Sequence, residues 1–156
     1  MPQLIALAVD EKRILLESTG YRTLTGAVEL VTRLAAAEVP LAVASGASCV
    51  EVREALEGVG LTRYFPVALG AEDYTRGKPD PEPYLMAMDR LGVRQQASRC
   101  LVVEDATPGI LAGRAAGARV VGVRAGNFAG YDLSPADLVI DTLAELTDEL
   151  CANLVA

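Results

Sequence analysis

Short apolar runs recur along the chain, separated by longer segments of mixed polarity. Each run has the length of a buried parallel strand and is too short for a helix. The predicted strands are residues 41–44, 66–69, 100–103, 119–123 and 136–140. A further apolar run, residues 4–9 (LIALAV), comes first in the chain and is followed by the charged cluster 10–13.

The segments between these runs carry apolar residues at helical spacing and end at proline or glycine. Pro40 ends the first of them, and Gly58 and Gly117 end two others. The predicted helices are residues 27–37, 49–57, 82–91, 109–116 and 142–150. Short strands that alternate with helices specify an α/β fold, in which helices cover both faces of a mostly parallel sheet. We predict a single core domain over residues 1–156.

Two adjacent carboxylates, Glu104 and Asp105, stand where the strand 100–103 should end. Thr107 is predicted to cap the helix that follows, with Pro108 at its first position. Ligands of open α/β sheets bind at the carboxyl ends of the strands, and paired carboxylates suit Mg²⁺. The alternative is that the two acids only interact favourably with the positive end of the helix dipole.

Ser45 and Gly46 lie between a predicted strand and the start of the next helix. Free backbone N–H groups and a hydroxyl in this place would form a cradle for a phosphate group. The alternative is ordinary capping of the helix by Ser48 or Ser45.

Lys78 lies between Gly77 and Pro79, just before a predicted helix. Most lysines are solvated surface charges. This one lies between a glycine and a proline just before a helix, an unusual setting for a surface charge, so the alternative is a functional lysine.

Composition narrows the functions open to the chain. A formal net charge of −7 argues against a nucleic-acid surface. No apolar run approaches the roughly 18 residues of a membrane span, and no signal peptide is visible. The three widely spaced cysteines indicate reduced thiols in a cytoplasmic protein. The sequence has no histidine, so acid–base chemistry would fall to carboxylates or lysine.

Three stretches, in this order and spacing, resemble motifs of the haloacid dehalogenase (HAD) superfamily, especially its β-phosphoglucomutase-like phosphatases and phosphomutases. They are LAVASGAS, GKPDPEPYL and VVEDATPGILAGRAAGA. The resemblance implies a Rossmann-like core without a complete cap and a small phosphorylated metabolite as substrate. It also implies that Ser45 and Gly46 bind phosphate, that Lys78 holds the phosphoryl group and its nucleophile, and that Glu104 and Asp105 bind Mg²⁺.

The family's first motif, D-x-D-G-[TV], has no intact counterpart here. In one interpretation Asp10 ends a central strand made of residues 4–9 and is the nucleophile and a metal ligand. Lys12 then stands where the family has its acid–base aspartate. In the other, residues 1–24 are the remnant of a cap helix, and the nucleophile would precede Met1. A missing central strand would leave two buried strand edges unpaired, which favours the first interpretation.

Three hypotheses follow for the function. The chain is a phosphoryl-transfer enzyme, with activity impaired by its altered first motif. Alternatively, it is a non-catalytic HAD-fold domain that binds phosphate, Mg²⁺ or a partner. A third possibility is an incomplete core that needs a strand from another chain, which predicts oligomers formed through strand edges.

Overall fold

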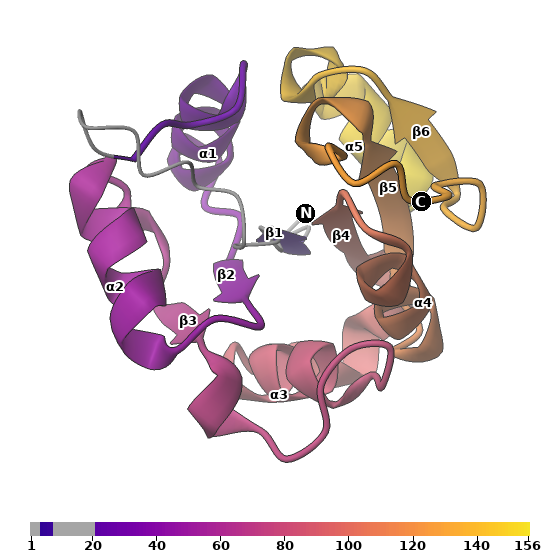
Figure 1. The fold of residues 1–156 in the computed structure, drawn as a ribbon. Helices are drawn as coiled ribbons and strands as arrows, with labels where there is room; N and C mark the ends of the chain where they lie inside the picture. Colours follow the sequence, from indigo (N-terminus) through magenta and orange to yellow (C-terminus); the bar gives the residue numbers. More distant parts are fainter. Residues whose placement is uncertain (1–3, 8–20) are drawn as a thin grey trace.

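The computed structural model describes residues 4–7 and 21–156. Within those residues, six strands form one sheet in the order β3-β2-β1-β4-β5-β6, and every neighbouring pair is parallel (Figure 1). The strands are β1 (Leu4–Leu7), β2 (Leu41–Ala44), β3 (Val67–Leu69), β4 (Cys100–Glu104), β5 (Arg119–Val123) and β6 (Leu138–Ile140). The predicted α/β class is confirmed.

Helices connect the strands and cover both faces of the sheet (Figure 1). They are α1 (Ala27–Ala36), α2 (Cys49–Gly58), α3 (Glu82–Arg90), α4 (Thr107–Ala115) and α5 (Asp148–Leu154). Short 3₁₀ segments lie between them, at Thr62–Tyr64, Ala71–Asp73, Arg94–Arg99, Arg124–Gly126 and Leu143–Glu145. Most predicted boundaries are correct to within one or two residues.

β1 occupies the centre of the sheet, between β2 and β4. Ile5 is opposite Leu41 on one side and Leu101 on the other. This is the place that the strand interpretation assigns to the first apolar run, because the gap between β2 and β4 is filled. Asp10 lies outside the described residues, so the assignment of residues 1–24 as a whole stays a prediction.

Alternation along the strands divides the core between the two faces of the sheet. Val43 of β2 and Val103 of β4 belong to one apolar cluster, together with side chains of α1, α2 and α5. Val102 of β4 belongs to the other cluster, together with Tyr84 of α3 and Ile110 of α4. The side chain of Glu104, two positions after Val102, therefore lies on the face covered by α3 and α4.

The predicted closing helix exists, but its bounds, residues 142–150, are wrong. The chain instead forms a 3₁₀ turn at Leu143–Glu145 and starts α5 later. Two threonines each begin a new turn: Thr142 donates its N–H to the Glu145 carboxylate at 2.9 Å, and the Thr147 hydroxyl accepts from the Leu150 N–H at 3.2 Å. Because each threonine starts a turn of its own, the segment forms two short elements and not one continuous helix.

The predicted cap at Thr107 is also wrong. Ala106 holds the N-cap position, and Thr107 is the first residue of α4. The Thr107 hydroxyl donates to the carbonyl of Asp132 at 2.7 Å, so it ties the helix to a distant loop.

Among the described residues, the helices are too short or too polar to span a membrane.

Candidate active site at the carboxyl edge of the sheet

Three of the predicted site segments meet at one edge of the sheet. Ser45 directly follows β2, and Glu104 is the last residue of β4, with Asp105 next. β1 lies between these two strands, and all three run in the same direction. Lys78 comes from the loop that joins β3 to α3 and reaches Glu104 directly.

The carboxylate of Glu104 is the centre of this arrangement. Its side chain is only 1% exposed, and Oε1 accepts two hydrogen bonds, from Lys78 Nζ at 2.6 Å and from the Tyr84 hydroxyl at 2.5 Å. Oε2 accepts from the Asp105 N–H at 3.2 Å. Lys78 is 14% exposed, so this is a largely buried, hydrogen-bonded ion pair. Such a pair holds both groups in a fixed orientation.

Helix α4 passes directly over the Glu104 carboxylate. A Cβ atom at Gly109 would lie 1.9 Å from both Cδ and Oε1 of Glu104, so only glycine fits there. Gly126 has the same relation to the next acid, since its Cβ would lie 2.3 Å from Asp105 Oδ2. The two glycines allow the backbone to enclose the acid pair closely.

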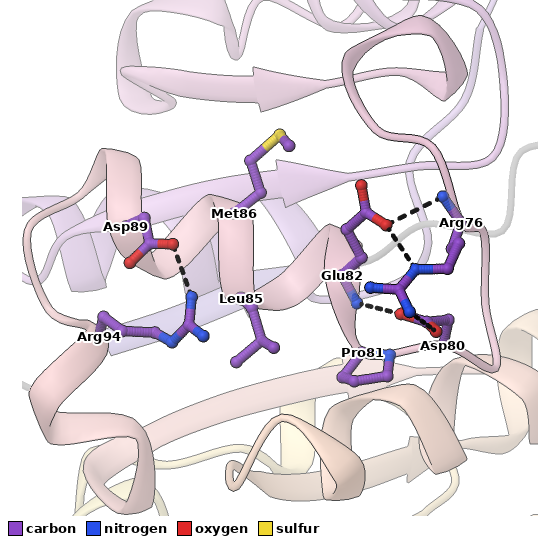
Figure 2. A pocket seen from close by; sticks show the side chains of 8 residues that line it. All are labelled: Arg76, Asp80, Pro81, Glu82, Leu85, Met86, Asp89 and Arg94. Atoms are coloured by element: carbon purple, nitrogen blue, oxygen red, sulfur yellow. Dashed lines mark hydrogen bonds and ion pairs between the residues drawn. The ribbon is translucent and has the colours of Figure 1, made fainter.

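The loop that carries Lys78 is braced by acidic side chains of its own segment. The Glu82 carboxylate accepts from the N–H groups of Thr75 at 2.8 Å and Arg76 at 3.0 Å. Asp80 accepts from the Glu82 N–H at 2.9 Å (Figure 2). These bonds fix the backbone on both sides of Lys78. The resemblance did not single out Glu82, although it stands within the quoted motif.

Ser45 is fully buried, and its backbone carbonyl is hydrogen-bonded to the loop that carries Lys78. Its Oγ accepts from the Ala47 N–H at 3.1 Å, and its carbonyl accepts from the Tyr74 hydroxyl at 2.6 Å. The adjacent Gly46 is exposed. Ser48, rather than Ser45, caps α2: its Oγ accepts from the Glu51 N–H at 3.2 Å. The capping interpretation thus applies to Ser48 and leaves Ser45 as the phosphate-binding candidate.

Tyr84 is a site residue that sequence reasoning missed. Its side chain is fully buried, and burial together with the nearby Glu104 carboxylate raises its pKa well above the usual value. The phenol is therefore protonated and donates its hydrogen to Glu104. In the sequence it occupies an apolar position of an amphipathic helix, which indicates only a core residue.

Among the described residues, no group of three or more histidine, cysteine, aspartate or glutamate side chains is arranged to hold a metal ion. Glu104 and Asp105 form a pair, and the third predicted ligand, Asp10, lies outside the described residues.

No disulfide is present in the described part of the chain, which includes all three cysteines. The Cys49 thiol contacts Asp73 Oδ2 at 3.1 Å, and this hydrogen bond raises the pKa of Cys49.

A cavity of about 310 Å³ lies along α3 (Figure 2). Ion pairs mark its two ends: Arg94 binds Asp89 at 2.6 Å, and Arg76 binds Glu82 at 3.0 Å. Lys78, Glu104 and Asp105 do not line this cavity, so it is separate from the acid pair and its lysine. Its lining residues are Arg76, Asp80, Pro81, Glu82, Leu85, Met86, Asp89 and Arg94.

The sequence matches a family model described as haloacid dehalogenase-like hydrolase over residues 6–123. This is most of the chain, and it includes Ser45, Lys78, Glu104 and Asp105. The chain belongs to this family of HAD-like hydrolases. The resemblance noted from the three motifs is confirmed.

Two relatives are phosphatases. The HAD-like chain is 37% identical over 133 residues to hexitol phosphatase A of Escherichia coli, covering 84% of this chain and 59% of that protein. It is 36% identical over 120 residues to phosphoglycolate phosphatase of Pectobacterium atrosepticum, covering 76% of this chain and 50% of that protein. The chain thus spans between half and three fifths of the length of these two relatives.

Two solved structures have a fold similar to that of this chain. The β-phosphoglucomutase of Clostridium difficile matches with a TM-score of 0.73 and 29% identity, over 85% of this HAD-like chain and 56% of that one. CbbY of Rhodobacter sphaeroides, solved in complex with phosphate, matches with a TM-score of 0.72 and 26% identity, over 79% of this chain and 55% of that one. The predicted Rossmann-like core is confirmed.

Proposed function

We propose that this chain is the core of a Mg²⁺-dependent phosphoryl-transfer enzyme, of phosphatase or phosphomutase type, acting on a small phosphorylated metabolite. The observation that supports it most is the contact between Lys78 and Glu104 at the carboxyl edge of the sheet, beside Asp105. This contact places a cation that can bind a phosphoryl group next to two carboxylates that can bind a metal ion. The phosphatase relatives and the phosphate complex of CbbY favour the same chemistry.

Lys78 would neutralise charge on the phosphoryl oxygens, which is the main task of a protein in phosphoryl transfer. The Ser45 hydroxyl and the Gly46 N–H would bind further oxygens of the same group, as oriented donors. Because the Lys78 loop is braced by Glu82 and tied to Ser45 through Tyr74, the backbone that carries these donors is held in place before the substrate arrives.

The acid pair fits Mg²⁺ by the chemistry of its donors. Glu104 and Asp105 offer hard carboxylate oxygens, which this ion prefers, and Gly126 leaves room for backbone to pack against Asp105. Glu104 Oε1 already accepts from Lys78 and Tyr84, so Oε2 and the Asp105 carboxylate would be the ligands. A bound Mg²⁺ would add positive charge beside the phosphoryl group.

We propose Asp10 as the nucleophile and as the third metal ligand, because β1 is a central strand of the sheet and Asp10 follows it closely in the sequence. Lys12 stands at the acid–base position of the family motif. A lysine is a poor proton donor to a leaving group at neutral pH, so turnover would be slow. We further propose that residues 1–156 form one core domain without a complete cap, and that it is cytoplasmic, in keeping with its unpaired thiols.

We expect the chain to release phosphate from a panel of phosphomonoesters that includes hexitol phosphates and phosphoglycolate, and only when Mg²⁺ is present. Asp10→Asn should lower kcat by about 10³-fold or more, because an amide is not a nucleophile. Asp148 is an exposed acid on α5, so Asp148→Asn is the matched control. The activity of this variant should equal that of the wild type.

Colorimetric phosphate release is the measurement. Turnover that survives Asp10→Asn would show that Asp10 is not the nucleophile. An inactive wild-type chain would favour the non-catalytic alternative, a HAD-fold domain that binds phosphate or Mg²⁺ without turnover.

A further inference from the structure

We infer that Tyr84 is a positioning residue, which keeps Glu104 oriented and hydrogen-bonded when Lys78 turns toward a phosphoryl group. The inference about Glu104 rests on geometry alone. The statement about the phosphoryl group rests on the function proposed above.

Tyr84 and Lys78 share one acceptor. The hydroxyl at 2.5 Å and the ammonium at 2.6 Å both donate to Oε1 of Glu104. The ammonium also lies 5.1 Å from the centre of the Tyr84 ring, a distance at which ring and cation attract each other. Tyr84 therefore contacts both partners of the ion pair.

Little water can replace either donor. Glu104 is 1% exposed and Tyr84 is fully buried, while α4 closes the other side of the carboxylate at Gly109. A buried oxygen that loses its donors carries the full cost of its lost hydration. With two donors present, the loss of one leaves Oε1 still hydrogen-bonded.

This arrangement has a consequence for ligand binding. To bind a phosphoryl oxygen, Lys78 must weaken its bond to Glu104. The Tyr84 hydroxyl lowers the cost of that step, because Oε1 keeps a donor throughout. Without the hydroxyl, Lys78 would be the remaining donor that the structure gives to Oε1 and would be held more tightly.

The test is a double-mutant cycle on stability, with Tyr84→Phe, Lys78→Met and the double variant, measured by urea unfolding. Tyr84→Phe keeps the ring and its packing and removes the hydroxyl. Tyr84→Phe should raise the unfolding equilibrium constant by about tenfold, and Lys78→Met, which breaks the buried ion pair, should raise it by about 10²-fold or more. The double variant should exceed the product of the two effects by roughly another tenfold, because only then does Oε1 lose both donors.

Tyr64→Phe combined with Lys78→Met is the matched control, since the Tyr64 hydroxyl is bound to Arg63 on the surface and its effect should simply multiply. If the double variant is unfolded in buffer, the cycle is repeated in trimethylamine N-oxide, which stabilises folded states. A Tyr84→Phe effect that multiplies with that of Lys78→Met, or falls below the product, overturns the inference.

The second readout is the affinity for inorganic phosphate in the presence of Mg²⁺, followed by ³¹P NMR. Tyr84→Phe should weaken it by about tenfold. Unchanged affinity in Tyr84→Phe would overturn the positioning role. A wild-type chain that binds no phosphate would instead contradict the proposed function and leave the stability cycle to decide the contact.

Discussion

Replacing Glu104 with alanine is expected to lower the free energy of unfolding by about 3 kcal/mol or more, the usual cost of breaking a buried ion pair by removing one partner. The substitution leaves the Lys78 ammonium and the Tyr84 hydroxyl without their shared acceptor inside the protein. It also opens a gap beneath α4 at Gly109. Urea denaturation without phosphate or metal measures the loss.

The control for this prediction is a surface ion pair. Asp148 binds Arg33 at 2.6 Å, but its side chain is 68% exposed, so Asp148→Ala should cost no more than about 1 kcal/mol. A Glu104→Ala variant as stable as Asp148→Ala would mean that the buried pair contributes little and that its geometry is not what fixes this edge of the sheet.

Lys78→Met is expected to lower kcat/KM for the best phosphomonoester by about 10²–10³-fold, the usual cost of removing one donor aimed at developing charge. Methionine fills a similar volume and removes the ammonium, so the effect reports charge rather than packing. Initial rates at saturating Mg²⁺ measure it.

Arg94→Met is the matched control for Lys78, because it removes a cation at the far end of α3 that is paired with Asp89. Its kcat/KM should stay within about twofold of the wild-type value, as for most surface changes. Equal losses in the two variants would show that general electrostatic attraction, and not a localised cation, accounts for the effect.

The sequence predicted the sheet well because strands such as β2 and β4 are buried along their whole length and are therefore almost continuously apolar. Residues 41–44 are apolar throughout, residues 119–123 carry one charged residue at Arg119, and the two segments correspond residue for residue to β2 and β5. The start of the C-terminal helix could not be predicted from the sequence. Thr142 and Thr147 each start a turn, and the apolar spacing does not show which of them caps the helix.

The candidate site was predicted in part. The resemblance named both Lys78 and Glu104, and the structure joins them at 2.6 Å. Tyr84 and Gly109 could not be identified by periodicity, because a tyrosine on the apolar face of a helix and a glycine near a helix start are ordinary features. Their roles depend on how closely α3 and α4 approach the end of β4, which is decided by tertiary packing.

The most direct test of a combined phosphate and metal site is a titration of the wild-type chain with inorganic phosphate, with and without Mg²⁺, followed by ³¹P NMR. We expect binding that Mg²⁺ strengthens by about tenfold or more, since two ligands in one site are coupled reciprocally. We also expect Lys78→Met to remove this binding. Binding that is independent of Mg²⁺ and survives Lys78→Met, or no binding at all, would show that the chain has no such combined site.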